Sequence, residues 1–525
     1  MSSLHTWAGL VVAWVLYAMF LTGTASYFRE EITRYMRPEL SASLSLPTVQ
    51  LVPKVVDSIR QRAPAATQIS ITLPTERKPF VSAFWRDPST QGRGFQTALF
   101  DPLSAQALQA RDTQGGDFFY AFHFNFHYIP VLWGRWLAGL CAMFMLVAII
   151  SGVITHKKIF VDFFTFRWGK GQRSWLDAHV GLSVLALPFH FMITWSGLVT
   201  LMVMYMPLGL QALPLANDRA AVISEMRFFM PADKPVGQAA VLTSLEALIQ
   251  QFEQHWDVGS VGAVQLNNPA DTMAKVIIAR QQNQRISTTP QYMVFDGVSG
   301  DLLRVKDSSG LAATTQGVLY GLHLGRFADT VTRSLYFLLS LAGTAMVGSG
   351  LVLWTVKRRA QLPDPKRPYF GFRLVERLNI ATIAGLSVSI SSYFWLNRLL
   401  PLGIVERATW EIHGFFIVWA GTLAWAVVRP AKKAWVELLW LSAILLALLP
   451  VLNIFTTQRH LLNSLRDKDY LFVCFDLAWI SFAALHAWLA LRTSRHQARL
   501  KPKLRTPACP SADATVHRSL TARRA

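Results

Sequence analysis

The residues of this sequence best suited to chemistry are histidines that recur at matched positions in its first two thirds. His5 and His179 each begin a long apolar run, and each is followed 18 residues later by a glycine. His127 and His323 lie 196 positions apart, and each begins another apolar run. Two imidazoles that face each other from neighbouring helices are axial ligands that a haem iron takes. The spacing therefore predicts two haem sites, one between His5 and His179 and one between His127 and His323.

Two more histidines are candidate ligands. His190 follows His179 by 11 residues, which places it near the same helix face and about 16 Å further along the helix. It is a candidate ligand for the second haem or for an intermediate one, and the matching position in the first copy of the pattern is Leu16. His123 lies one turn before His127 and is an alternative ligand in its place. Each of these histidines also has an ordinary interpretation as an interfacial side chain at a helix end.

The apolar runs around the histidines predict a membrane protein. Hydrophobic residues make up 52% of the chain and charged residues only 16%, whereas an ordinary cytosolic enzyme is nearer a quarter charged. A helix needs about 20 apolar residues to cross the hydrocarbon. The predicted spans are 1–29, 126–156, 176–207 and 326–356, followed by a four-helix membrane extension at 374–491. The three cysteines are scattered without a Cys-x-x-Cys pair, which excludes thiolate clusters and a disulfide framework.

Basic residues predict the orientation of the chain. The loops 157–175 and 357–373 and the tail 492–525 are rich in Lys and Arg, and short basic segments mark the cytoplasmic side. Both termini are therefore expected in the cytoplasm, and the large polar stretches 30–125 and 208–325 outside it. A cleaved signal peptide is disfavoured because no Lys or Arg precedes the first apolar run. The orientation accounts for the net charge of +20 without a nucleic-acid partner.

An internal repeat organises the first two thirds of the chain. Each polar stretch reads as a helix followed by short strands and ends in a similar turn, Phe100-Asp101-Pro102-Leu103-Ser104 or Phe295-Asp296-Gly297-Val298-Ser299. The two turns are 195 positions apart. Up to about residue 357 the chain is therefore expected to contain two copies of one unit. The four later spans have no assigned role.

These motifs resemble the PepSY-associated transmembrane family over about residues 1–357. The resemblance is carried by Phe122-His123-Phe124-Asn125-Phe126-His127-Tyr128, Ser151-Gly152-Val153-Ile154-Thr155-His156-Lys157-Lys158, Trp175-Leu176-Asp177-Ala178-His179, Pro188-Phe189-His190-Phe191-Met192-Ile193-Thr194 and Leu322-His323. It implies an α-helical polytopic membrane protein of about eight transmembrane helices with two periplasmic α+β PepSY-like domains, in a bacterial inner membrane. PepSY domains often end Asp-Pro-x-Thr-Gly, and the first ending here lacks the glycine.

This family includes ferric-siderophore reductases. Its members are taken to bind two b-type haems through histidines in the membrane helices. The resemblance therefore implies a haem b reductase that passes electrons to a periplasmic ferric siderophore or other ferric chelate for iron uptake. No Gly-x-Gly-x-x-Gly follows a predicted strand, so the expected electron donor is quinol or a separate reductase. Two alternatives are a non-catalytic membrane anchor whose outer domains bind a partner, and a siderophore or iron transporter built on the repeat.

Overall fold

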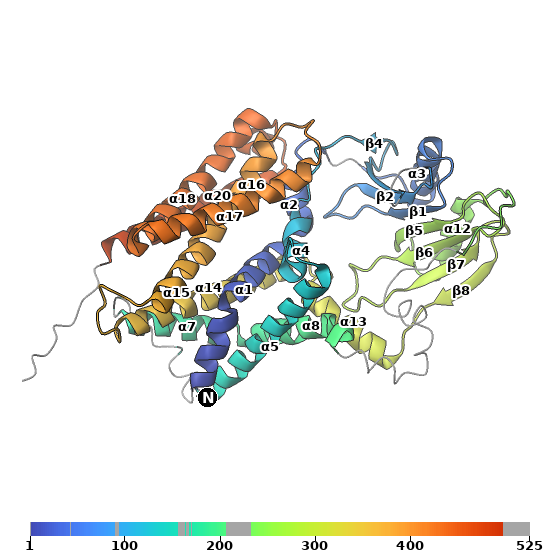
Figure 1. Ribbon diagram of the computed structural model, residues 1–525. Coiled ribbons are helices and arrows are strands. Elements are labelled where there is room, and N and C mark those ends of the chain that lie inside the picture. The colour runs from blue at the N-terminus through green and yellow to red at the C-terminus, as the bar shows by residue number, and fades with distance from the viewer. Residues whose placement is uncertain are drawn as a thin grey trace, which may run out of the picture.

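Within the described residues, the computed structural model (Figure 1) contains eight segments long and apolar enough to cross a membrane, if a bent pair of helices is taken as one span. Seven are continuous helices, and the eighth is a pair of helices bent by 69°. The structure describes residues 2–496 except 42–43, 90–93, 156–162, 164–166, 168, 170 and 206–232. Most of the predicted basic tail 492–525 and most of the loop 157–175 fall outside the described residues. The prediction of a multi-pass helical membrane protein is confirmed.

The spans fall into two groups of four. The first bundle contains α1 (Ser2–Ser26), α5 (Val131–Thr155), the pair α7 (Gln172–Leu185) and α8 (Leu187–Thr200), and α14 (Thr330–Arg359). The C-terminal bundle contains α15 (Phe370–Ile380), which continues through a π-helical turn η1 (Ala381–Gly385) into α16 (Leu386–Leu399), then α17 (Arg407–Val428), α18 (Ala431–Thr456) and α20 (Tyr470–Arg495). The short helices α9 (Met202–Tyr205) and α19 (Leu461–Arg466) follow α8 and precede α20.

The bend between α7 and α8 has a local cause. Pro188 stands in the first turn of α8, where it removes a backbone donor and cannot continue the preceding helix. Ala186, between the two helices, does not have helical backbone angles. The predicted third span is thus two half-helices, and this moves His190 onto a different axis from His179.

A short helix precedes the second span of each copy. These helices are α4 (Gly116–Asn125), which contacts α1 and α5, and α13 (Leu311–Leu324), which contacts α8. Their equivalence gives the first bundle a twofold-like plan. We call the end of the bundle near α4 and α13 the sheet-side end, and the end where α1 begins the far end.

The two polar stretches form one sheet rather than two separate ones. The strands β1 (Gln68–Thr72), β2 (Val81–Arg86), β3 (Phe95–Phe100), β4 (Ala107–Leu108), β5 (Val261–Asn267), β6 (Lys275–Arg280), β7 (Tyr292–Asp296) and β8 (Leu302–Lys306) are ordered β4-β3-β2-β1-β5-β6-β7-β8. All neighbours are antiparallel, and β1 pairs with β5 to join the copies. The helices α3 (Thr48–Arg62) and α12 (Leu245–His255) pack together, and their apolar side chains share one core with the sheet.

The turns at the ends of β3 and β7 confirm the repeat. Asp101 Oδ1 accepts hydrogen bonds from the backbone N–H of Leu103 and Ser104, and Asp296 Oδ1 accepts the equivalent pair from Val298 and Ser299. Gly300 has a φ of 81°, a left-handed conformation that suits glycine. Ala105 occupies the equivalent position in the first copy with a φ of 56°, so the same turn forms there without a glycine.

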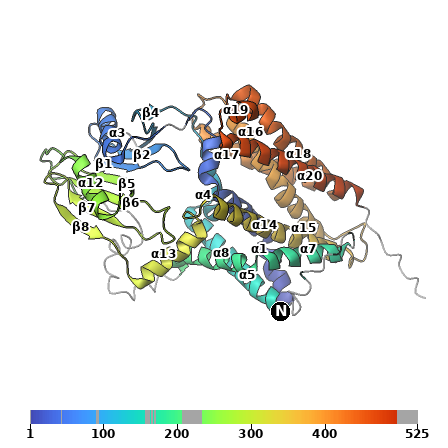
Figure 2. The same cartoon turned by 180° about the vertical axis from the view of Figure 1, so that it is seen from behind.

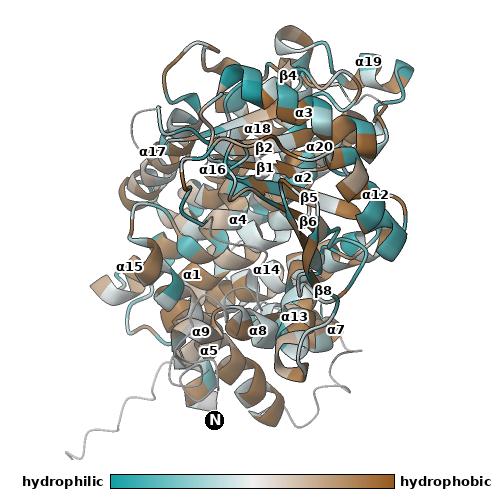
Figure 3. Ribbon diagram, turned by 90° about the vertical axis from the view of Figure 1, so that its right-hand side faces the viewer, coloured by the Kyte–Doolittle hydropathy of each residue, from teal (hydrophilic) through white to brown (hydrophobic). Residues whose placement is uncertain are grey.

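The three parts of the molecule are distinct in space. Figures 1 and 2 show the sheet and the C-terminal bundle at different sides of the first bundle, with α2 (Arg29–Tyr35) between them. Figure 3 shows hydrophobic residues along α1 and α5 and hydrophilic residues gathered around α3 and α12. The sheet therefore belongs to the aqueous side, and the helices to the bilayer.

Candidate functional site

Two pairs of histidines face each other inside the first bundle. The ring centroids of His5 and His179 are 6.3 Å apart, with an angle of 67° between the ring planes. Those of His123 and His323 are 6.2 Å apart, with an angle of 33°. Each pair takes one residue from each copy of the repeat.

The pairs lie at opposite ends of the bundle. His5 on α1 and His179 on α7 are at the far end, while His123 on α4 and His323 on α13 are at the sheet-side end. His123 packs against Gly23, which follows His5 by 18 residues on α1. At 1.5 Å per residue, 18 residues correspond to about 27 Å along the helix. The two pairs are therefore close to opposite faces of the apolar layer.

Each of the four imidazoles is held on a neighbouring helix by the same backbone feature. Nδ1 lies within hydrogen-bonding distance of a backbone carbonyl oxygen, and the residue four positions after that carbonyl is a glycine that contacts the ring. The four combinations of histidine, carbonyl and glycine are His5 with Ala148 at 2.9 Å and Gly152, His179 with Met346 at 3.0 Å and Gly350, His123 with Met19 at 2.6 Å and Gly23, and His323 with Ile193 at 3.0 Å and Gly197. We call each such carbonyl and glycine a docking notch.

The glycine in a docking notch has a steric reason. The carbonyl of residue i in a helix already accepts from the N–H of residue i+4, so a side chain at i+4 would cover it. A Cβ added at Gly23 would lie 2.7 Å from Cε1 of His123, and one at Gly197 would lie 2.9 Å from Cε1 of His323. At Gly152 and Gly350 the corresponding distances are both 3.2 Å. At Gly23 and Gly197 a side chain would displace the imidazole from the carbonyl, whereas at Gly152 and Gly350 it would require only a small shift of the ring.

The docking notches also select the chemistry of the rings. A carbonyl oxygen can only accept, so Nδ1 must carry the proton in each docked imidazole. Nε2 then holds a lone pair and is the nitrogen that can bind a metal ion. Ser196 Oγ, 3.1 Å from Nδ1 of His323, adds a second polar contact on the protonated side. The four rings are thus arranged as neutral ligands rather than as cations.

The separation of the rings fits one metal ion between each pair. A metal–imidazole bond is about 2.0 Å and the ring centre lies about 1.1 Å beyond the nitrogen, so imidazoles on opposite sides of one ion have ring centres about 6 Å apart. Within the described residues, no group of three or more His, Cys, Asp or Glu side chains is placed to hold a bare metal ion. A haem needs only two axial ligands because its porphyrin supplies the other four. The donor set therefore fits a haem better than a free ion.

His127 does not occupy the position predicted for it. The prediction that it pairs with His323 at the start of a span is wrong, because α4 ends at Asn125 and α5 begins only at Val131. Phe126 and Tyr128 have positive φ values of 57° and 63° and turn the chain between these helices. The His127 ring stacks at 16° on Phe416 of α17. The alternative in the sequence argument, His123, is the residue that faces His323.

His190 lies apart from both pairs. It is 1% exposed, and its Nε2 is buried without a hydrogen-bond partner. Its ring meets Phe20 edge to face at 6.2 Å, and a Cβ added at Gly343 would lie 3.0 Å from Nε2. The matching position in the first copy is Leu16, also buried. His190 therefore occupies a position that belongs to one copy only.

The sequence argument connected only Gly23 and Gly197 with particular histidines and did not connect Gly152 or Gly350 with any. All four docking notches share a sequence pattern that could have identified them. In each, a serine or threonine directly precedes the glycine: Thr22-Gly23, Ser151-Gly152, Ser196-Gly197 and Ser349-Gly350. Gly152 and Gly350 are 198 positions apart, close to the offset of the rest of the repeat. Their partner histidines could not be assigned without the packing of α5 against α1 and of α14 against α7.

Fold and site together define a multi-pass membrane protein in which paired histidines join two copies of a repeat. The family model described as the PepSY-associated TM region matches residues 2–357. The chain therefore belongs to this family, and the resemblance drawn from its histidine motifs is confirmed. No curated protein matches the chain. The family match ends where the C-terminal bundle begins.

Proposed function

We propose that the protein is a haem-containing reductase that carries electrons across a bacterial inner membrane to a ferric chelate, such as a ferric siderophore, for iron uptake. The observation that supports this most directly is the pair of matched histidine sites at opposite ends of one bundle. Haem bound at each pair would supply a one-electron carrier near each membrane face.

The chain's own residues hold and orient the ligands. The docking notches fix the Nδ1 proton of His5, His179, His123 and His323 and turn each ring away from the helix on which it docks. All four histidines are partly buried among the helices of the first bundle. A ligand held in one orientation by a backbone acceptor loses little entropy when it binds a metal ion.

The direction of transfer follows from the charges. The last turn of α14 at the far end carries Lys357, Arg358 and Arg359, which favours a cytoplasmic far end and a periplasmic sheet. Both termini are then cytoplasmic. The proposed donor is quinol from the bilayer or a separate reductase. Reduction to Fe(II) weakens binding by hard oxygen ligands and releases the iron.

The first test is spectroscopic. Purified protein is expected to show a b-type reduced-minus-oxidised spectrum and two haems per chain by pyridine haemochrome assay. His179→Ala and His323→Ala should each remove one haem, and a different one. His486→Ala is a matched control, because the Nδ1 of His486 contacts the carbonyl of Phe482 in its own helix. Well-folded protein without a haem signal would leave the anchor or transporter as the better explanation.

The second test is activity. Reduced protein in vesicles should transfer electrons to Fe(III)-EDTA, and a ferrous-specific dye should report the product. Loss of this transfer in both His179→Ala and His323→Ala, with the membrane assembly intact, is the result expected if the two sites act in series. Unchanged transfer in both variants would contradict the proposed path.

A further inference from the structure

A cleft of about 430 Å³ opens beside the first copy's half of the sheet, a volume within the usual range of small-molecule sites. Ser82 and Phe84 of β2 contribute to one wall, on the sheet face opposite α3. Arg37, Arg111 and Asp112 line it as well. We call this the arginine cleft. A second cleft, of about 280 Å³, is lined by Glu76 and by no basic residue.

Arg37 is a cation without a matching anion. One of its terminal nitrogens donates a hydrogen bond to the Thr113 carbonyl at 3.1 Å, while Nε is buried without a partner. Within the described residues it forms no ion pair with a carboxylate. Burial lowers the pKa of its guanidinium, but an arginine stays charged at any physiological pH. Asp117, Asp112 and Glu411 lie close enough to oppose part of this lowering of the pKa, but a largely buried charge without a directly paired counter-ion is still costly.

The carboxylates around Arg37 already have other partners. Asp112 accepts a hydrogen bond from the backbone N–H of Ala408 at 3.2 Å, and Asp117 pairs with Arg29. Glu411 is bound by Arg407 and by two further side chains. The second cation of the cleft, Arg111, pairs with Glu39 at 2.6 Å. Arg37 is therefore the cation with capacity for an added anion.

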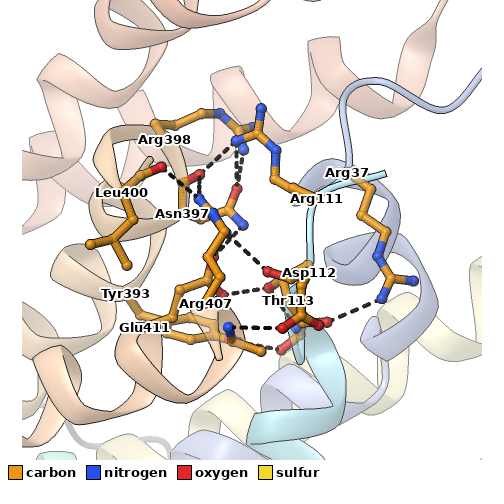
Figure 4. Close-up of polar contacts among 12 residues, drawn as sticks. Arg37, Arg111, Asp112, Thr113, Tyr393, Asn397, Arg398, Leu400, Arg407 and Glu411 are labelled. Atoms are coloured by element: carbon orange, nitrogen blue, oxygen red, sulfur yellow. Dashed lines mark hydrogen bonds and ion pairs between the residues drawn. The ribbon is translucent and has the colours of Figure 1, made fainter. Parts of the chain in front are cut away.

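The C-terminal bundle holds this part of the cleft in place (Figure 4). Arg407 donates to the carbonyl of Asp112 at 3.0 Å, and Thr113 donates to Glu411 at 2.5 Å. Arg111 donates to the carbonyl of Asn397 at 2.6 Å. The side chains of Arg407 and Glu411 are fully buried. These contacts fix the segment 111–113 on α16 and α17, which gives the C-terminal bundle a role in forming the site.

The arginine cleft is also connected to the sheet-side histidine pair. The segment 111–113 leads directly into α4, which begins at Gly116 and carries His123. Seven residues of helix correspond to about 10 Å. A ligand beside Arg37 thus lies at one end of a short helix whose other end carries a residue of the pair.

We propose that the arginine cleft binds the ferric chelate and selects anionic, carboxylate-bearing complexes, with Arg37 as the residue that pairs with the carboxylate. The proposal rests on the proposed function for the identity of the ligand. An arginine can form two parallel hydrogen bonds with a carboxylate, and Phe84, 39% exposed, offers an apolar surface for the rest of the ligand.

The test uses gallium(III) complexes, which match ferric complexes in shape and do not accept electrons. Binding of anionic Ga(III)-EDTA to the full-length protein in detergent is measured by isothermal titration calorimetry. Arg37→Gln is expected to weaken binding at least about tenfold, as for loss of a charged hydrogen-bonded pair. Arg37→Lys should have a smaller effect because it keeps the charge. The cationic gallium complex of desferrioxamine B should bind wild-type protein more weakly than Ga(III)-EDTA.

Arg86→Gln is the matched control, since Arg86 is exposed on β2 and does not line the cleft. It should leave Ga(III)-EDTA binding unchanged. Equal binding by the wild type and Arg37→Gln, with equal thermal unfolding, would overturn the role of Arg37. Absence of binding to the wild type would overturn the site itself. Because the assay involves neither haem nor electrons, it remains informative if the protein contains no haem, while the haem spectrum and the electron-transfer assay test the proposed function separately.

Discussion

The docking notches can be tested by a graded series of glycine-to-alanine substitutions. At Gly23 an added Cβ would come within 2.7 Å of Cε1 and 2.8 Å of Nδ1 of His123, so the ring must leave its carbonyl. At Gly152 the closest approach, to Cε1 of His5, is 3.2 Å, which a shift of a few tenths of an ångström relieves. Gly9 and Gly181 have no atom within 4 Å of the added Cβ and serve as controls on α1 and α7.

The expected magnitudes separate these positions. Alanine is favoured over glycine in a helix by about 0.5–1 kcal/mol, so Gly9→Ala and Gly181→Ala should be neutral or slightly stabilising. Gly23→Ala gains the same helix preference but loses the hydrogen bond of His123, about 0.5–1.5 kcal/mol, and displaces one side of the sheet-side pair. The stability of the haem-free protein should therefore change little, while the cofactor content should fall by one haem. Gly152→Ala should keep both haems.

Haem content by pyridine haemochrome assay and the electron paramagnetic resonance of the oxidised protein provide the measurement. Displacement of His123 should convert one low-spin signal to high spin or abolish it, and the far-end signal should stay unchanged. The reasoning is refuted if Gly23→Ala keeps two low-spin haems with the spectra of Gly9→Ala. It is also refuted if Gly181→Ala loses a haem, because an open position would then be as sensitive as a docking notch.

Three further predictions concern other parts of the molecule. His190→Leu copies Leu16 of the first repeat and removes a buried nitrogen without a hydrogen-bond partner, so the unfolding temperature should rise or stay level, and both haems should remain; loss of a haem would make His190 a ligand. Arg407→Met leaves Glu411 buried without its cation and should cost about 3–5 kcal/mol, seen as a lower unfolding temperature that Arg407→Met with Glu411→Leu partly restores. Backbone N–H groups of the turn after β7 lower the pKa of the Asp296 carboxyl. Its stabilising contribution is therefore full above the pKa of the unfolded chain and lost as pH falls through the lower folded value, and Asp296→Asn should flatten the acid limb of thermal stability.

The sequence was sufficient for the spans and the repeat because both depend on local patterns. The apolar runs needed only a count of residues, and the turns at Asp101 and Asp296 share the same local hydrogen bonds. The pairing of β1 with β5 was not predictable from local patterns. The two strands are almost 200 positions apart, and no short hairpin turn connects them. Two copies with exposed first strands could equally have formed two sheets.

The error at His127 shows where spacing fails. His127 and His323 have the more regular offset of 196, while the residues that meet, His123 and His323, differ by 200. The chain in the first copy makes a turn through Phe126 and Tyr128, whereas α13 ends at Gly325 in a left-handed cap. The difference arises in the helices, because α4 has 10 residues and α13 has 14, so the offset grows by about one helical turn between their first and last residues.

The docking notches also explain why the sites lie between the copies. His5 docks on α5 and His123 on α1, both within the first copy, and His179 docks on α14 and His323 on α8, both within the second. Every paired histidine is thus oriented by its own copy, yet each pair joins the two copies. A group bound between the rings would bridge the repeat at both ends of the bundle and stabilise its assembly by its own binding energy. A single copy could orient one histidine of each pair and complete neither pair, so both pairs depend on the duplication.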